Sequence, residues 1–353
     1  MTGDPVRVQG ITVAALTQGV VVPSTRFRVT QHMEALARRD VHIRHLPARF
    51  GSYPPRFRVQ RVPWSIAALA ESSLRVIEAN RADVVLLQRE LLSTLRTAER
   101  FIRRPYVFDV DDAIFANARG DGTNQIARSA AVTICGNSFL AEHYQALSPV
   151  VVIPTAVDTD RFVPAAETCE LRPVIGWSGS SSGFEYLYEI EDALRIVLDK
   201  NPDAVVHVVA DRQPEFALLP PDRVQFQRWS PDIEILALQQ FTVGLMPLRD
   251  SVWARGKCSF KMLTYMSVGV PVVVSPVGMN REVLALGPCG HAAGSRDEWV
   301  QALCDVLSNR NRASLMGKEG RRIAVEHYSQ AVLAPRLGEV IRSVACGRGK
   351  LHL

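Results

Sequence analysis

The sequence predicts an α/β fold with two doubly wound, Rossmann-like domains. Its 353 residues are enough for about two domains of roughly 150 residues each. Short runs rich in Val and Ile alternate with longer segments of helical period, which is typical of parallel-sheet α/β units. A polar, Pro-containing stretch at 154–172 interrupts this alternation, which then restarts. We therefore expect an N-terminal domain over 1–168 and a C-terminal domain over 169–328, facing each other across a cleft.

The first half shows this alternation from its first apolar run onward. Strands are expected at 9–16, 41–46, 83–88, 106–110, 131–135 and 150–153. Helices are expected at 27–39, 65–80, 91–102 and 137–147. The segment 48–63 contains three prolines, Pro54 and Pro55 among them, and four arginines and fits neither period. It therefore predicts a loop, and such loops are usually functional or mobile.

The second half repeats the pattern. Strands are expected at 174–177, 204–210, 224–227, 243–246 and 271–275, with a weak one near His291. Helices are expected at 184–200, 233–241, 260–268, 281–286, 297–308 and 312–327. A final helix at 330–345, within the C-terminal segment 329–353, has no obvious place in the second domain, so we expect it to pack back on the first.

Composition and charge narrow the class of protein. Hydrophobic residues at 47 % and charged ones at 22 % are globular values. No apolar run approaches the ~20 residues of a membrane span, and the N-terminus lacks a signal pattern, so we expect a cytoplasmic location. The net charge of +5 lies in residues 1–165, which hold 20 Arg, no Lys and 15 acidic residues. This excess is too small to indicate nucleic-acid binding, whereas peripheral contact with the inner face of a membrane, an acidic substrate or a solvated face all stay open.

The first motif of interest is a strand that runs into a Gly/Ser turn and then a helix. The turn contains Gly179, Ser180, Ser181 and Ser182. Small residues let a ligand approach the backbone, and the amides at a helix start suit a phosphate. The pattern is neither a dinucleotide fingerprint nor a P-loop, so a plain strand–helix connection is the alternative.

Three cations lie where a second helix begins. Arg255, Lys257 and Lys261 precede or enter the helix expected at 260–268, and cations are unfavourable at that end of a helix. We therefore expect an anionic group to bind to these cations. The alternative is that they are surface cations that pair with Asp250. A further strand–loop–helix segment contains Gly278, Met279 and Asn280, and its amides could hold a second anionic or hydroxyl-rich group.

Three carboxylates, Asp109, Asp111 and Asp112, emerge from an apolar strand of the first half. Crowded carboxylates raise one another's pKa and often act as acids, bases or groups that orient a hydroxyl. Helix capping and a metal site are the alternatives, although no further metal ligands are evident nearby. After the first strand, Arg26 and Arg28 could grip an anionic group from the cleft, or simply face solvent.

Eight segments, in this order, resemble the family 4-like (group 1) glycosyltransferases of GT-B architecture, and especially a bacterial nucleotide-sugar-dependent subgroup. They are Ser24–Arg28, Leu87–Glu90, Phe108–Ile114, Gly136–Asn137, Ile153–Asp158, Ile175–Ser180, Gly256–Lys261 and Ser275–Asn280. The resemblance implies retaining transfer of a sugar from a nucleoside diphosphate sugar, the co-substrate, to a glycan, lipid-linked or small-molecule acceptor. It implies neither a metal nor any other cofactor.

The resemblance also implies roles for residues. Asp111 or Asp112 would lie near the anomeric carbon and the acceptor hydroxyl, and Lys261 would neutralise charge on the leaving β-phosphate. The donor-binding residues would be Gly179, Ser180, Ser181, Ser182, Arg255, Lys257, Lys261, Thr264, Gly278, Met279 and Asn280. The acceptor side would hold Arg26, Arg28 and Asp109.

The chain departs from the wider family at two places. Typical members have two glutamates eight positions apart, where this chain has Gly256 and Thr264. They also have an Arg and Lys pair after the first strand of the second domain, where this chain has hydroxyl groups and no cation. A catalytically silent nucleotide-sugar-binding scaffold of the same fold is therefore the alternative. An NAD-dependent oxidoreductase is disfavoured because the Gly-rich fingerprint is missing, and a sugar-nucleotide epimerase matches fewer residues.

Overall fold

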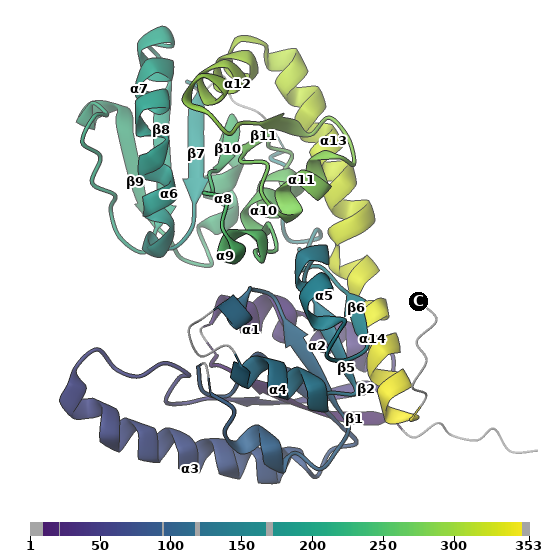
Figure 1. The fold of residues 1–353 in the computed structure, drawn as a ribbon. Coiled ribbons are helices and arrows are strands. Elements are labelled where there is room, and N and C mark those ends of the chain that lie inside the picture. The colour runs from purple at the N-terminus through teal and green to yellow at the C-terminus, as the bar shows by residue number, and fades with distance from the viewer. Residues whose placement is uncertain (1–9, 21, 94, 117–120, 167–171, 348–353) are drawn as a thin grey trace, which may run out of the picture. The chain divides into compact units, whose positions relative to one another are not determined.

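The computed structural model describes residues 10–20, 22–93, 95–116, 121–166 and 172–347, in two compact units (Figure 1). Unit 1 comprises Met1–Ala156 and Gln330–Leu353, and unit 2 comprises Val157–Ser329. The sequence predicted division after 168 and after 328. Unit 2 begins earlier than predicted, at Val157, because Val157 and Phe162 are buried in one of its hydrophobic cores. The Val157 N–H also donates to the Tyr328 carbonyl at 2.8 Å.

Unit 1 is built on a parallel six-stranded sheet. Its strands are β1 (Ile11–Thr17), β2 (Val41–Pro47), β3 (Val84–Gln88), β4 (Tyr106–Val110), β5 (Val132–Cys135) and β6 (Val150–Val152). Their order is β2-β1-β3-β4-β5-β6. The order reverses between β1 and β3, and in open α/β sheets the carboxyl ends of strands at such a switch point are the usual ligand-binding place.

Helices cover the unit 1 sheet. They are α1 (Pro23–Arg28), α2 (Met33–Ala37), α3 (Arg61–Ala79), α4 (Asp121–Ser129), α5 (Ser138–Tyr144) and α14 (Gln330–Ala345). Short 3-10 turns are η1 (Thr30–His32), η2 (Arg58–Gln60), η3 (Ala98–Phe101) and η4 (Ile114–Ala116). The last helix belongs here because Leu333, Leu337 and Ile341 of α14 join one core with the inward side chains of the strands and with Leu36 of α2.

Unit 2 is built on a second parallel six-stranded sheet. Its strands are β7 (Val174–Ser178), β8 (Val205–Ala210), β9 (Val224–Arg228), β10 (Val243–Met246), β11 (Val272–Val274) and β12 (Gly290–Ala292). Their order, β12-β11-β10-β7-β8-β9, is that of a Rossmann fold, with its switch point between β7 and β10. This architecture confirms the predicted fold class of two doubly wound parallel sheets.

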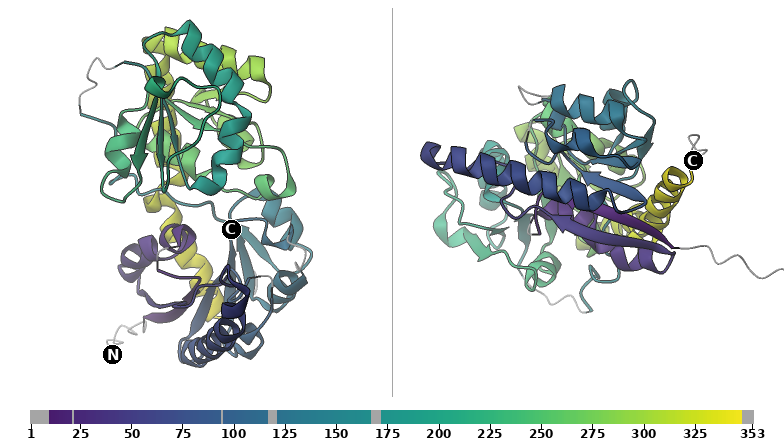
Figure 2. Two further views of the ribbon diagram at one scale, coloured as in Figure 1. Left: turned by 90° about the vertical axis from the view of Figure 1, so that its left-hand side faces the viewer. Right: turned by 90° about the horizontal axis from the view of Figure 1, so that it is seen from below.

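The helices of unit 2 pack on both faces of its sheet (Figure 2). They are α6 (Phe184–Glu189), α7 (Glu191–Lys200), α8 (Glu234–Gln239), α9 (Val252–Arg255), α10 (Phe260–Ser267), α11 (Met279–Leu284), α12 (Arg296–Ser308) and α13 (Arg310–Tyr328), with turns η5 (Ser181–Gly183) and η6 (Pro221–Arg223). Alternate side chains of β7 reach opposite faces. Ile175 and Trp177 join the core under α6, α7 and α12, whereas Val174 joins the core under α8, α10 and α13.

The helix predicted at 91–102 is wrong. The described residues of this stretch form only the turn η3 and a bridge between Leu92 and Leu95. The buried Glu99 accounts for the difference, because its carboxylate accepts the backbone N–H groups of Leu91 at 2.8 Å and of Thr97 at 2.5 Å. A side chain that bonds nearby amides competes with helix hydrogen bonds, so the chain folds into a loop around it.

Candidate functional site

Three of the predicted segments of unit 2 meet at the carboxyl end of its sheet. The Lys261 side chain runs from the start of α10 past the turn after β7, so closely that a Cβ at Gly179 would collide with it. Its ammonium nitrogen lies 5.5 Å from the centre of the Trp177 ring. A side chain at 179 would therefore displace the end of Lys261 from this position.

The third segment, the loop after β11, is fixed to the start of α10. The buried Asn280 side chain donates to the Ser275 carbonyl at 3.0 Å and accepts from the Ser259 hydroxyl at 2.6 Å. Gly278 has a φ of 53°, and a Cβ there would lie 2.6 Å from the Arg255 carbonyl oxygen. The loop at 275–280 and the segment at 255–261 therefore form one rigid edge, in which Asn280 serves through its side chain.

Tyr265 is a positioning residue that sequence reasoning missed. Its buried hydroxyl accepts the Ser178 N–H at 2.8 Å, and burial raises the pKa of this phenol. The bond ties α10 to the end of β7, one turn after Lys261. Only the helical spacing of Lys261 and Tyr265 was visible in the sequence, and this spacing does not reveal the strand that Tyr265 contacts.

Several predicted donor-binding residues already bond to neighbours within unit 2. Asp211 accepts the Ser181 N–H at 2.5 Å and the Ser181 hydroxyl at 2.8 Å, and the Ser180 and Ser182 hydroxyls lie 2.7 Å apart. Desolvation acts to raise the pKa of Asp211, but the hydrogen bonds from Ser181 act in the opposite direction, and the pKa is lowered. The amide of Ser181 is thus taken by a side chain of its own unit.

The predicted cations and the helix residues also have internal contacts. Arg255 makes two hydrogen bonds to Asp250, at 2.7 and 2.8 Å, which is the pairing that the alternative interpretation expected. The Lys257 ammonium lies 5.7 Å from the Trp253 ring centre. The Thr264 hydroxyl donates to the Lys261 carbonyl at 2.8 Å, and the Met279 side chain is buried in the core. Met279 is therefore placed to act through its backbone alone.

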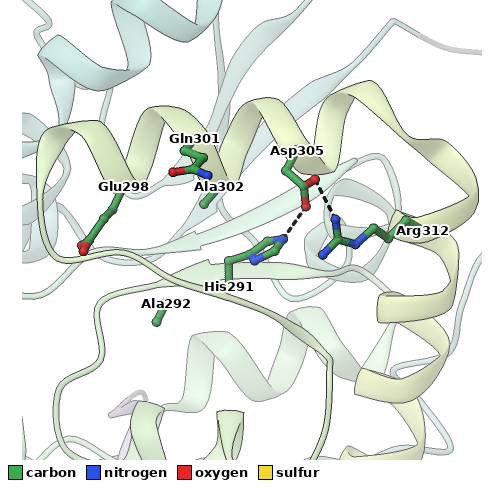
Figure 3. A pocket seen from close by; sticks show the side chains of 7 residues that line it. All are labelled: His291, Ala292, Glu298, Gln301, Ala302, Asp305 and Arg312. Atoms are coloured by element: carbon green, nitrogen blue, oxygen red, sulfur yellow. Dashed lines mark hydrogen bonds and ion pairs between the residues drawn. The ribbon is translucent and has the colours of Figure 1, made fainter.

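Two concave surfaces lie in unit 2. One, of about 120 Å³, lies among the loops after β10, β11 and β12 and includes Leu248, Ser275 and Trp299. The other, of about 290 Å³, is larger, and Figure 3 shows Asp305 between His291 and Arg312 at its wall. Both bonds of Asp305, to the His291 ring and to the Arg312 guanidinium, measure 2.8 Å. This trio joins β12, α12 and α13 and includes no predicted site residue.

In unit 1, a single arginine holds two of the predicted carboxylates. Arg89 donates through Nε to Asp111 at 2.6 Å and through Nη2 to Asp112. Desolvation works against its charge, but the two carboxylates raise the pKa of Arg89 well above its usual value. Its backbone is left-handed, with φ at 59°. Arg89 lies in a family-like segment but received no predicted role, since nothing in the sequence indicates which carboxylates it meets.

The third carboxylate has its own partner. Asp109 pairs with Arg28, whose Nε lies 3.0 Å from it and whose Nη1 donates to the Ile153 carbonyl at 2.8 Å. Burial raises the pKa of Asp109, and the guanidinium opposes this change. Both side chains are buried and join α1 to β4. Of the three residues predicted on the acceptor side, only Arg26 is partly exposed, with its guanidinium 4.2 Å from the Phe27 ring centre.

Gln88 is a further residue that sequence reasoning missed. It ends β3 beside the switch point and stands in register with Asp109 on β4. Its side chain is only 1 % exposed, yet neither amide atom makes a hydrogen bond within the described part of the chain. Because buried polar groups are nearly always paired, this amide is a candidate for binding a polar group.

Residues 172–309 match the family model described as "Glycosyl transferases group 1". The matched residues all lie within unit 2. Comparison with curated protein sequences gave no match.

Known structures share the fold of the whole chain. Sucrose-phosphate synthase from Thermosynechococcus elongatus has a TM-score of 0.70 at 14 % identity, over 96 % of this chain and 100 % of that one. HepE from Anabaena, in complex with UDP, has a TM-score of 0.69 at 15 % identity, over 94 % and 100 %. A Listeria monocytogenes protein named as a UDP-N-acetylglucosamine 2-epimerase has a TM-score of 0.64 at 12 % identity, over 94 % and 96 %. The chain therefore has the GT-B fold, which by itself fixes no reaction.

The described residues contain neither a candidate metal centre nor a candidate membrane span. Among them, no three His, Cys, Asp or Glu side chains are grouped in a way that could hold a metal ion. None of the helices described is both long and apolar enough to cross a membrane.

Proposed function

We propose that the protein is a glycosyltransferase that moves a sugar, with retention, from a nucleoside diphosphate sugar to a glycan, lipid-linked or small-molecule acceptor. One observation carries the proposal. Lys261 lies against the Gly179 turn at the carboxyl edge of the unit 2 sheet, inside the part of the chain that matches the group 1 family. A cation beside a glycine turn and a helix start suits a diphosphate.

In this proposal, the donor binds to unit 2. The amides of Ser180 and Ser182 and the Lys261 ammonium would hold the diphosphate, while the Gly179 amide stays with the Val209 carbonyl and the Ser181 amide stays with Asp211. The backbone at 278–280 would contact the phosphate or the donor sugar. Arg255 and Lys257 would add to the positive field, and Thr264 lies in the second turn of α10. The known complex of HepE with UDP supports a nucleotide of this class.

The chemical step would depend on the departing phosphate. As the bond between the anomeric carbon and the β-phosphate oxygen breaks, the acceptor hydroxyl oxygen bonds that carbon on the same face. The hydroxyl proton passes to the departing phosphate oxygen, and the nucleoside diphosphate leaves. Lys261 would offset the negative charge that develops on the β-phosphate, which is the kind of fixed electrostatic contribution that lowers a barrier most. We include neither a metal nor another cofactor in this step.

The acceptor would bind to unit 1. Asp111 and Asp112, held by Arg89, present carboxylate oxygens that can orient an acceptor hydroxyl, and the Gln88 amide could bind a second hydroxyl. Arg26 is the partly exposed cation of this side. A cytoplasmic or peripheral membrane location belongs to the same proposal, because the net positive charge lies in this half of the sequence.

A silent nucleotide-sugar-binding scaffold is the second candidate, and a specific observation favours it. Where typical family members have two glutamates, this chain has Gly256 and Thr264, and the Thr264 hydroxyl is used by the Lys261 carbonyl of its own helix. Release of free sugar or transfer product from the donor separates the two candidates, since only the enzyme turns the donor over.

Thermal stability with UDP, GDP, ADP, their common sugar conjugates and NAD tests donor binding. At a hundredfold excess over the dissociation constant, a ligand adds ~2.7 kcal/mol, which is a rise of several degrees. We expect one nucleoside diphosphate to raise the melting temperature. Lys261→Ala should weaken its affinity by roughly 10–100-fold, because one charge-assisted contact is lost.

Lys318→Ala is the matched control, because Lys318 is an exposed lysine on α13 and should leave nucleotide affinity unchanged. Affinity that Lys261→Ala leaves intact would remove Lys261 from the donor site. A folded protein that responds to none of the nucleotides would contradict donor binding, and a response to NAD alone would contradict the proposed reaction.

A further inference from the structure

One long helix of unit 1 is apolar on two sides. The buried side of α3 faces the rest of the unit, as in an ordinary amphipathic helix, and is made of Ala68, Ser72, Arg75, Val76 and Ala79. The other side carries exposed large apolar residues, between 43 and 69 % accessible: Val62, Ile66, Leu69, Leu74 and Ile77. Figures 1 and 2 show α3 along one side of unit 1, with one end projecting past the strands.

The loop before α3 extends this exposed surface. Its exposed apolar residues are Phe50, Tyr53, Phe57 and Val59. Nine of the twenty exposed large hydrophobic side chains in the described part of the chain thus lie within residues 50–77. Contiguous exposed apolar area of this kind marks an interaction site. We call the exposed side chains of residues 49–77 the α3 surface.

The loop is held firmly on the helix. The Glu71 carboxylate accepts the backbone N–H groups of Arg49 at 2.8 Å and of Phe50 at 3.3 Å. The Trp64 indole N–H donates to the Phe50 carbonyl at 2.9 Å, and the Arg61 guanidinium donates to the Pro55 carbonyl at 3.2 Å. The α3 surface is therefore preformed, so binding to it would require little ordering.

The charged residues in the N-terminal part of this surface, from 49 to 70, are all of one sign. From residue 49 to residue 70 the chain contains four exposed arginines, Arg49, Arg56, Arg58 and Arg61, and neither an acidic residue nor a lysine. The first turn of α3 has no acidic residue, and its N-cap residue makes no side-chain capping bond. Cations are unfavourable at this end of a helix unless an anionic partner binds to them.

We propose that the α3 surface docks unit 1 on an anionic lipid bilayer. Its arginines would lie at the phosphate headgroups, and Phe57, Val62 and Ile66 would enter the boundary between headgroups and acyl chains. Arginines interleaved with exposed aromatic and branched residues are the composition of interfacial helices. A bilayer also needs no shape complementarity, and neither pocket described above includes a residue of this surface.

Co-sedimentation of the full chain with lipid vesicles tests the proposal. We expect binding to vesicles of equal parts phosphatidylcholine and phosphatidylglycerol, weakened by salt, and little binding to phosphatidylcholine alone. The triple variant Arg56→Gln, Arg58→Gln, Arg61→Gln should weaken binding on the order of 10–100-fold, because each basic side chain contributes to attraction by anionic lipid. Ile66→Gln should weaken it through the apolar contact.

Matched variants keep the result specific. The triple variant Arg38→Gln, Arg39→Gln, Arg128→Gln removes the same charge from other exposed positions of unit 1, and Leu315→Gln replaces a side chain as exposed as Ile66. Both should bind vesicles like the unmodified protein. Circular dichroism and the nucleotide thermal shift should be unchanged in every variant, which separates failure of docking from failure of the proposed function.

Four outcomes would overturn the proposal. The first is the absence of binding to anionic vesicles, and the second is equal loss of binding in the test and control variants. The third is a dimer in light scattering that Ile66→Gln dissociates, since the α3 surface would then bind a second copy of the chain. Equal binding to both vesicle types would likewise contradict the role given to the arginines.

Discussion

At the scale of single residues, Arg89 is the arginine that pairs with both proposed catalytic carboxylates. It is largely buried, its backbone is left-handed, and its guanidinium is shared between Asp111 and Asp112. Removing one partner of a buried ion pair leaves the other charge uncompensated, which typically costs more than the pair itself contributes. The two proposed catalytic carboxylates therefore depend on this arginine for their position and their solvation.

Arg89→Met should destabilise the protein by about 2–4 kcal/mol, because it leaves two mostly buried carboxylates without their cation. Asp111→Asn should cost less in the Arg89→Met background than alone, with a coupling of about 1–3 kcal/mol in a double-mutant cycle. Urea unfolding monitored by circular dichroism measures these free energies. Additive free energies would show that Arg89 and Asp111 do not interact.

Arg38→Met is the control for this cycle. Arg38 pairs with Glu34 on an exposed helix surface, so its loss should change the unfolding free energy by at most about 0.5 kcal/mol. Nucleotide binding should be unchanged in all these variants, because none of the altered residues lies in unit 2.

At the scale of elements, the loop between β11 and α11 depends on a close backbone approach. Gly278 has φ 53° and ψ −134°, a combination that side-chain-bearing residues avoid. A Cβ there would also lie 2.6 Å from a carbonyl oxygen of the neighbouring segment, which is backbone and cannot rotate away. The loop and the start of α10 can approach one another only because residue 278 is glycine.

Gly278→Ala should therefore destabilise unit 2 by about 2–4 kcal/mol and weaken nucleoside diphosphate binding, because strain and collision act together. Gly269→Ala is the control, since Gly269 also has a positive φ, of 75°, but a Cβ there would make only ordinary contact at 3.4 Å. It should cost about 1 kcal/mol, for strain alone. Equal costs would show that the approach to Arg255 imposes no constraint.

Trp fluorescence in urea follows these variants, because four of the five tryptophans, Trp177, Trp229, Trp253 and Trp299, belong to unit 2. Isothermal calorimetry with the nucleoside diphosphate measures the affinity.

The elements themselves were largely predictable from sequence. Strands buried on both faces have continuous Val and Ile runs, such as β8 and β11, and these runs are unambiguous in length and composition. The stretch at 91–102 misled, because its apolar spacing fits a helix while Glu99 bonds the nearby amides. The spacing of apolar residues does not indicate where a side chain will compete for the backbone amides of a helix.

At the scale of the whole molecule, the sequence predicted which segments approach the carboxyl edges of the two sheets, because strand–loop–helix order sets that edge. It did not predict the partners within each edge. Asp211 accepts a hydrogen bond from the Ser181 amide, Arg89 pairs with Asp111, and the Tyr265 hydroxyl accepts a hydrogen bond from the Ser178 amide. These partners are 22 to 87 positions apart in the sequence. Such pairings follow from how helices pack on the sheet, and spacing along the chain does not reveal them.

Acid sensitivity is a property of the whole fold. Burial lowers the pKa of His32, His45, His143 and His207, so each of these rings is harder to protonate in the folded protein than in the unfolded chain. In His32, burial and then the nearby Arg28 lower the pKa from 6.5 to about 3. Below pH 6.5 the unfolded chain binds a proton at this position that the folded chain does not bind. Protons therefore favour unfolding, and stability falls as the pH drops from 6.5 toward 3.

His32 alone should reduce the unfolding free energy by about 1.4 kcal/mol for each pH unit in this window, or about 2 kcal/mol between pH 6.5 and pH 5. Urea unfolding by circular dichroism at pH 7 and pH 5 measures the loss. His32→Gln should show a clearly smaller loss between the two pH values, whatever its stability at pH 7, because glutamine does not titrate.

His291→Gln is the matched control, since His291 is partly exposed beside Asp305 and its replacement should leave the acid loss of unit 1 unchanged. The carboxylates whose pKa the fold lowers, such as Asp83, which accepts hydrogen bonds from Thr12, lose their contribution only at lower pH. They therefore do not account for the loss that His32 causes between pH 6.5 and pH 5. An acid loss in His32→Gln equal to that of the unmodified protein would mean that His32 already binds a proton in the folded state.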